Sequence, residues 1–240
     1  MDEKRRRFLL AALSGGLLVG GLGWNRSALA ELLGQVPRRL PEGRSVFRLI
    51  GDVEINGRPA DRETLIGPED HIRTGAGAEL VAVVGSDAFI LRENTELNLS
   101  LGDRAVQGLR LLTGALLTVF AERGDDSEVQ VETVVAHIGV RGTGLYAESH
   151  PTRSYVCNCY GAIELAASDD RRHRESIVSR HHDAPRWVLA EPKNGQRIIP
   201  APFINHSDME LILLEALVGR RVPFGAPGRV YQGGAGGYLE

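Results

Sequence analysis

The chain has 240 residues, and its 28 Lys and Arg against 31 Asp and Glu give a formal net charge of −3. A mildly acidic chain is not expected to bind nucleic acid, because proteins of that class present a basic surface. The length is sufficient for one domain with a substantial core. After the first 24 residues no apolar run is long enough to span a bilayer, which excludes a multi-span membrane protein.

The first 30 residues have the layout of a secretory signal. Basic residues 4–7 precede an apolar run over residues 8–24, and the Ala-Leu-Ala sequence at 28–30 is typical of a cleavage site. The sequence RRRFL at residues 5–9 resembles the twin-arginine signal, which exports proteins already folded. We therefore predict that residues 1–30 are a signal peptide or an uncleaved N-terminal anchor. The protein is expected to be periplasmic and to touch a membrane only through such an anchor.

Short β-rich runs separated by turns dominate the next part of the chain. Residues 31–45 are polar, contain two prolines and are predicted to be a linker. Asn56-Gly57 is a strong hairpin signal because both residues tolerate positive φ, and further turns are expected at residues 85–87 and 93–94. Helical periodicity is hard to find before residue 205. This pattern predicts an all-β sandwich or roll of many short strands.

The last third of the chain has a different composition. Residues 168–224 are predicted to be a C-terminal extension with a His-rich loop and a helix. Within it, residues 171–187 are basic and turn-like, and residues 191–202 contain three prolines and are expected to be extended. The glycine-rich residues 225–240 are predicted to form a flexible tail.

One amphipathic helix is predicted within residues 205–224. Ser207 or Asp208 is a suitable N-cap, and Gly219 is expected to end the helix. Residues at i, i+3, i+4, i+7 and i+8 spacing predict an apolar face made of Met209, Ile212, Leu213, Ala216 and Leu217.

Several segments together resemble the FecR-type periplasmic sensor domain, the family of the iron dicitrate transport regulator. They are GDVEINGRPA, IRTGAGAELVAVVGSDAFILRENTELNL, LRLLTGALL and VETVVAHIGVRGTGLYAES, and they cover residues 46–167. The most specific part is the Val-Arg-Gly-Thr step, which contains Arg141, Gly142 and Thr143. The resemblance implies an all-β extracytoplasmic domain, and the best-known relatives sense an iron-uptake receptor and regulate a sigma factor. Only seven residues precede the apolar run, too few to fold as the cytoplasmic domain of such a regulator, so the sigma-factor role is not expected here.

The glycine-rich step at residues 139–144 could also be a phosphate-binding loop. Its flanks are strand-like, so we predict a β-bulge or a close backbone crossing in its place. Arg141 is expected to be a structural ion-pair or carbonyl donor, with ligand binding as the alternative.

The only two cysteines of the chain, Cys157 and Cys159, lie where the family is expected to have aliphatic strand residues. Side chains two apart on a strand point to the same face, with Cα atoms about 6.5–7 Å apart. Two thiolates so placed can share a metal if histidines complete the site, and the candidates are His181, His182 and His206. A Cys₂His₂ or Cys₂His set would suit zinc, copper or iron.

Other interpretations of the cysteine pair remain open. The two thiols could form a strained disulfide and act as a redox couple, or both could be buried packing residues. We expect the 181–186 loop and the helix to fold back over the strand that carries the cysteines. No hydrolase motif is present, and no enzymatic activity is expected. The leading expectation is an exported binding or sensor protein with an envelope protein partner, and the alternatives are a thiol-disulfide module and a metal-free interaction scaffold.

Overall fold

The computed structural model describes residues 39–67, 69–101, 106–123 and 128–224. The predicted signal or anchor, part of the linker and the glycine-rich tail lie outside these residues. The described part is mostly β-structure, with fourteen strands joined in one sheet and one α-helix, so the all-β prediction is confirmed. Within this part, no helix has both the length and the apolar character needed to cross a membrane.

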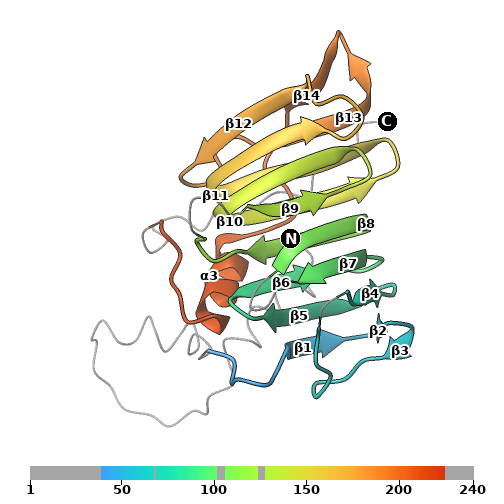
Figure 1. Ribbon diagram of the computed structural model, residues 1–240, viewed down its shortest axis with the longest axis vertical. Helices are drawn as coiled ribbons and strands as arrows, with labels where there is room; N and C mark the ends of the chain where they lie inside the picture. Colours follow the sequence, from blue (N-terminus) through green and yellow to red (C-terminus); the bar gives the residue numbers. More distant parts are fainter. Residues whose placement is uncertain (1–38, 68, 102–105, 124–127, 225–240) are drawn as a thin grey trace, which may run out of the picture.

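The first strands, β1 to β3, lie at the bottom of the molecule and the last, β12 to β14, at the top (Figure 1). The first seven are β1 (Val46–Ile50), β2 (Val53–Ile55), β3 (Arg58–Pro59), β4 (His71–Thr74), β5 (Glu79–Val84), β6 (Asp87–Leu91) and β7 (Glu96–Leu101). The rest are β8 (Val106–Val119), β9 (Val129–Glu132), β10 (Ala136–His150), β11 (Arg153–Ala167), β12 (Arg174–Ser179), β13 (Arg186–Lys193) and β14 (Gln196–Pro200), followed by the helix α3 (Asp208–Leu217).

Three long strands, β8, β10 and β11, connect the two ends of the sheet. The strand order runs β14-β13-β11-β10-β9-β8-β7-β4-β2-β3, and β10 also pairs directly with β8. β1, β5 and β6 branch from β8, while β12 pairs with β11. Nearly all pairs are antiparallel, and β8 with β9 is the parallel one. β11 is therefore bonded to β10 on one side and to β12 and β13 on the other.

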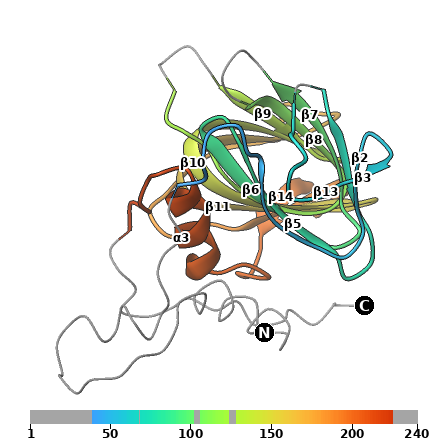
Figure 2. The same ribbon diagram turned by 90° about the horizontal axis from the view of Figure 1, so that it is seen from below.

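The part of the sheet near α3 is buried on both of its faces. Seen from below, the strands curve around an interior, and α3 lies against the outside of the curve (Figure 2). Alternate side chains enter two separate cores: Leu80 and Ala82 of β5 face the interior, whereas Val81 and Val83 pack in the core that also contains α3. This alternation follows from the period of two along a strand.

The sheet extends beyond the boundary at residue 167 predicted for the β domain. Strands β12, β13 and β14 lie in the segment that the sequence analysis interpreted as turn-like and extended. In β12, Ile177 is buried while Arg174 and Val178 are exposed. Arg174 is the one arginine of β12 and faces solvent on an outer strand, where charge is common. Arg171, Arg172 and Arg180 lie in the turns that flank β12.

α3 begins and ends where the sequence predicts, but it buries a different set of side chains. Ser207 is the N-cap residue, and Gly219 follows the C-cap with φ of +76°. The buried positions are Asp208, Glu210, Leu211, Leu213, Leu214, Glu215 and Leu217. Met209, Ile212 and Ala216 of the predicted apolar face are only half-buried. The helix turns two glutamates inward because partners for them exist in the sheet, as described below.

The glycine-rich step in β10 is a bulge, as predicted. The β10–β11 register shifts between Arg141 and Gly144, and Gly142 has φ of +51°. Thr143 is buried and donates to Asn158 Oδ1 at 2.9 Å. Arg141 is exposed and makes no hydrogen bond or ion pair with any described residue, so the expected structural donor role is not seen.

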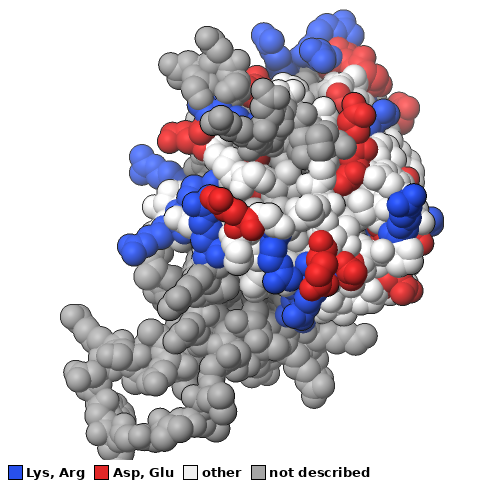
Figure 3. All heavy atoms as spheres, turned by 60° about the horizontal axis from the view of Figure 1, so that its bottom comes forward, with Lys and Arg blue, Asp and Glu red and all other residues white. Residues whose placement is uncertain are grey.

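Charges of both signs are interleaved on the face shown in Figure 3. Lys and Arg alternate there with Asp and Glu, and neither sign forms a continuous field. A surface that follows a phosphate backbone would need such a field.

Gly161 of β11 tests how tightly the bulge is packed. Its φ is +91°, and an added Cβ would lie 2.7 Å from Thr143 Cβ and 2.8 Å from the Gly142 carbonyl oxygen. Gly195 in the β13–β14 turn has a similar φ of +78° with no atom within 4 Å of an added Cβ. We expect Gly195→Ala to cost about 1–2 kcal/mol, the penalty of the backbone conformation alone. Gly161→Ala should cost clearly more in urea denaturation, and equal losses in the two variants would contradict the close packing.

Candidate metal centre

The two cysteines lie side by side on the face of β11 that belongs to the same core as α3. Cys157 and Cys159 are both fully buried and belong to the core beneath the helix. Asn158 between them points to the opposite face, where its amide donates to the carbonyls of Gly161 and Ile177 at 2.9 and 3.0 Å. The residue between the cysteines therefore holds the strand in place from behind, and the structure confirms that both thiols share one face.

The two histidines that reach the cysteines come from connecting segments. His182 lies in the turn after β12, has φ of +55°, and donates its backbone N–H to the Cys159 carbonyl oxygen at 2.9 Å. His206 precedes α3 and follows Asn205, whose φ is +59°. Left-handed backbone at a non-glycine residue is uncommon and often marks a functional site. Both turns direct an imidazole toward the sulfur atoms.

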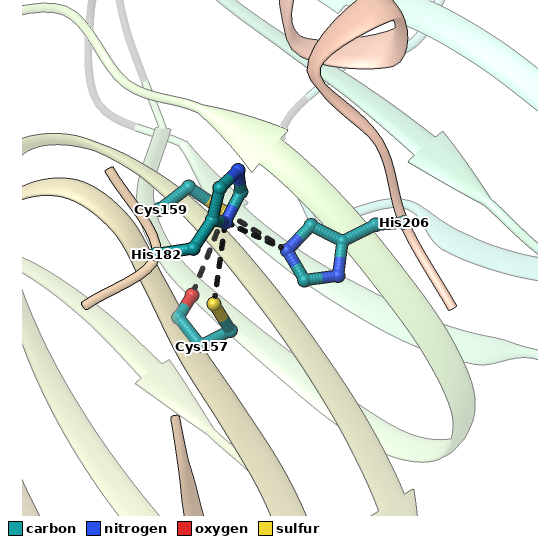
Figure 4. A group of neighbouring side chains, drawn as sticks. All are labelled: Cys157, Cys159, His182 and His206. Atoms are coloured by element: carbon teal, nitrogen blue, oxygen red, sulfur yellow. Dashed lines mark hydrogen bonds between the residues drawn. The ribbon is translucent and has the colours of Figure 1, made fainter. Parts of the chain in front are cut away.

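Two thiols and two imidazoles meet at one point (Figure 4). Cys157 Sγ lies 3.5 Å from His182 Nδ1, and Cys159 Sγ lies 3.4 Å from His206 Nε2. His182 Nδ1 and His206 Nε2 are 3.2 Å apart. All four atoms lie within 4.8 Å of one another.

The remote ring nitrogen of each histidine is fixed by an acceptor. His182 Nε2 lies 3.1 Å from Asp208 Oδ1, and His206 Nδ1 lies 2.7 Å from the Ile204 carbonyl oxygen. These acceptors keep the proton on the remote nitrogen of each ring. In the neutral imidazoles the lone pairs are then on Nδ1 of His182 and Nε2 of His206, the two nitrogens that face the sulfurs. An Asp or a backbone carbonyl behind a ligating histidine is the usual arrangement in metal proteins.

Three separations between the four donor atoms match edges of a tetrahedral zinc site. With Zn–S of about 2.3 Å and Zn–N of about 2.05 Å, tetrahedral angles give about 3.6 Å between sulfur and nitrogen and about 3.3 Å between two nitrogens. The corresponding distances in the structure are 3.5, 3.4 and 3.2 Å. The cluster can therefore hold a tetrahedral cation with little rearrangement of the four side chains.

The pKa values of the two thiols shift in opposite directions, because ionisation of one sulfur disfavours ionisation of the other. Burial opposes ionisation of Cys157, but hydrogen bonds with Cys159 and the two histidines outweigh it and hold its pKa well below the ordinary value. At Cys159, burial and interaction with the Cys157 sulfur together raise the pKa well above it. Burial also disfavours charge on His182, yet its bonds to Asp208 and Cys157 raise its pKa overall. A cation bound by two thiolates would displace these protons.

Aromatic rings seal the cluster from solvent. Tyr146 stacks on His206 with ring centroids 4.4 Å apart, and Phe203 lies 4.5 Å from His182 and 4.4 Å from His206. The two histidines are 6% and 3% exposed. Four protein donors that close a tetrahedron in a buried position are typical of structural metal sites, whereas catalytic sites keep one position open.

Four of the five predicted metal ligands come together, and His181 does not join them. His181 Nε2 lies 2.8 Å from Asp208 Oδ1, on the far side of that carboxylate from the cysteines. Adjacent residues in a turn point in different directions, so only one of the His-His pair can face β11. His181, His182 and Asp208 form a second, overlapping group of donor atoms. Burial opposes the charge of Asp208, but bonds from His182 and His181 outweigh it and lower its pKa.

The supporting roles of Asp208, Asn158 and Tyr146 were not predicted from the sequence. Asp208 was considered only as a helix cap, although its place two residues after His206 could have suggested a partner for an imidazole. Asn158 could have been suspected because it is the single amide between two thiols in an apolar strand. No local signal marks Tyr146, which is a strand partner of Cys157 across the β10–β11 ladder.

Buried ion pairs attach α3 to the sheet above this cluster. Arg92 Nη2 donates to Glu210 Oε1 at 2.5 Å, and Arg92 Nη1 donates to Glu79 Oε2 at 3.0 Å. Glu215 accepts from Tyr160 and from Arg220 Nε. These contacts give the two inward-facing glutamates of α3 their partners and fix the helix that begins at Asp208.

Comparisons with known proteins find only limited structural similarity. No family model matches the chain, and no curated protein matches it significantly. Two crystal structures of a candidate anti-sigma factor from Parabacteroides distasonis are similar at 12% and 11% identity, with TM-scores of 0.44 and 0.45. Each match covers 55% of this chain and 58% of the other. Similarity of this extent supports no conclusion about function, and the FecR-type resemblance stays a prediction.

Glu210→Ala tests the attachment of α3. The substitution leaves Arg92 buried with one of its two carboxylates, and breaking a buried pair costs about 3–5 kcal/mol. We expect a loss near the lower end, because Glu79 remains, measured by urea denaturation. Glu191→Ala at an exposed position of β13 is the matched control and should change stability by less than about 0.5 kcal/mol. Equal effects of the two substitutions would refute the proposed anchoring.

Proposed function

We propose that Cys157, Cys159, His182 and His206 bind one structural zinc ion. The observation that carries this proposal is the agreement between the sulfur and nitrogen separations in the cluster and the edges of a tetrahedral Cys₂His₂ site. The orientation of the lone pairs supports it independently, because both remote ring nitrogens have acceptors of their own.

Such an ion would join three segments that are distant in the sequence. The cysteines belong to β11, His182 to the turn after β12, and His206 to the segment that leads into α3. A bound ion would hold the turn and the start of the helix against the strand. Its role would be to stabilise the C-terminal part of the domain, because the closed coordination leaves no position for a substrate.

We further propose that the domain is an exported binding or sensor module of the cell envelope, with a protein partner. The support is the signal-like N-terminus and the FecR-type motifs of the sequence. A twin-arginine route would suit this site, since it would allow the metal to be inserted before export.

Zinc fits the site better than the other metals considered. Four-coordinate thiolate and imidazole donors suit Zn²⁺, and they suit copper as the second choice. The redox alternative is less well supported, since both sulfurs are buried and a reactive thiol is expected to be partly exposed.

Elemental analysis of untagged protein, purified without added metal, tests the zinc site directly. We expect about one equivalent of zinc in the natural protein. Cys157→Ser and His182→Ala should lose it, whereas His181→Ala, the matched control at the neighbouring histidine, should keep it. Retention of full metal content in Cys157→Ser would overturn the proposal.

Thiol titration of the same samples separates the remaining alternatives. A zinc site should show two reactive thiols after chelation and unfolding, without any reductant. If two thiols appear only after reduction, the cysteines form a redox pair. If metal is absent and both thiols are free, the scaffold interpretation holds.

Metal removal should lower thermal stability. A ligand at about 1,000 times its dissociation constant contributes about 4 kcal/mol, which for a chain of this size corresponds to about 8–16 °C in Tm. We expect a shift of this order when a chelator is added to the natural protein. The Cys157→Ser variant should be insensitive to the chelator, and equal sensitivity of both proteins would contradict a role for the cluster.

Asp208→Asn tests the carboxylate behind His182. Loss of such an acceptor typically weakens metal binding about 10–100-fold. We expect that weakening in competition titrations with a zinc chelator of known affinity. His181→Ala removes the other bond to the same carboxylate and should leave the affinity nearly unchanged. If His181→Ala weakens zinc binding as much as Asp208→Asn does, the affinity depends on the group of His181, His182 and Asp208 and not on the Asp208–His182 bond alone.

A further inference from the structure

A pocket of about 600 Å³ lies beside the Cys/His cluster and has no part in it. It lies between the end of β8, the bulge of β10 and β11, and the segment that follows α3. Its size falls in the range of small-molecule sites. The neighbours of two cluster residues line it, because Tyr160 follows Cys159 and His181 precedes His182.

Positive charge exceeds negative charge in the lining. Arg180, Arg220 and Arg221 line the pocket together with two glutamates. Glu215 already accepts hydrogen bonds from Tyr160 and Arg220, so its charge is compensated. Glu122 is the other carboxylate of the lining. The guanidinium groups of Arg180 and Arg221 are exposed and form no ion pair with other described residues. The free charges therefore favour an anion.

One donor of Arg220, a residue of the pocket lining, lacks an acceptor. Arg220 uses Nε for Glu215 and Nη1 for the Ser86 carbonyl oxygen, at 2.6 and 2.5 Å. Its Nη2 is buried and has no partner among the described residues. A buried donor of this kind requires an acceptor, and a carboxylate matches the planar guanidinium. The orientation of Arg220 is already fixed by its two other bonds.

The rest of the lining is apolar and aromatic. Phe120 and Tyr160 are 3% and 5% exposed, and Phe224 packs against both Tyr160 and His181 with ring centroids 5.9 and 4.5 Å apart. These walls can bury a ring or an alkyl chain. A pocket with apolar walls and a few directed polar groups is the usual form of a small-molecule site.

We propose that this pocket binds a small organic carboxylate with an apolar body, whose carboxylate is held by Arg220 with help from Arg180 and Arg221. The proposal does not depend on metal in the cluster. A ligand in this position would contact Tyr160 and His181, the neighbours of Cys159 and His182. Its binding would therefore affect β11 and the turn after β12, which carry these two metal ligands.

The test compares matched pairs of aryl carboxylates and their neutral primary amides, beginning with benzoate and benzamide, by ligand-observed NMR and titration. We expect the carboxylates to bind and the amides to bind at least about tenfold more weakly, the change expected for one charge-assisted hydrogen bond. Arg220→Gln should weaken carboxylate binding by a similar factor. Arg58→Gln, at an exposed position of β3, is the control and should leave binding unchanged.

Two further variants keep the test decisive if Arg220→Gln affects folding. Arg180→Gln and Arg221→Gln alter exposed side chains without ion pairs and should each weaken binding several-fold. The proposal is overturned if the carboxylates bind no better than the amides, or if none of the three arginine variants differs from Arg58→Gln. The same measurements on Cys157→Ser protein should still detect binding, which separates a failure of this proposal from a failure of the metal site.

Discussion

The burial of residues 154–160 of β11 on both faces is the constraint on which the rest of this structure depends. A strand covered on two sides must supply every polar atom it carries with a partner, because water reaches neither face. β11 places Asn158 toward one core and two thiols toward the other. The amide is satisfied by Thr143 and two backbone carbonyls, and the thiols are met by two imidazoles. The bulge in β10, the turn at His182 and the position of α3 all serve these needs.

The buried polar side chains of α3 also have partners. α3 does not have a clean apolar stripe, since Glu210 and Glu215 are as deeply buried as its leucines. Each carboxylate finds a cation in the sheet or after the helix, which makes its burial tolerable without making it strongly stabilising. The two ion pairs hold the helix in the orientation that places Asp208 behind His182.

The features that follow from the alternation of side chains along a strand, or from turn residues, could be predicted from the sequence. The alternation along β11 was enough to place both cysteines on one face, and the turn signals were enough for an all-β fold. His182 and His206 were among the candidates because imidazoles are few. The choice between His181 and His182 could not be made, since it depends on the φ of one turn residue. The strands after residue 167 were missed although their partners are near in the chain, because charged residues and prolines obscure the alternation of their side chains. The inward position of Glu210 could not be predicted, since its partner Arg92 is 118 residues away.

The spacing of the four donors along the chain has a consequence for the order of folding. Cys157 and His182 are 25 residues apart, and Cys159 and His206 are 47 apart. Contacts that close long loops form late, and a chain emerging from the ribosome supplies its C-terminal residues last. The sheet up to β11 can thus assemble while the thiols still lack their second imidazole. Completion of the cluster then coincides with the arrival of α3, so its formation marks the point at which this helix is joined to the sheet.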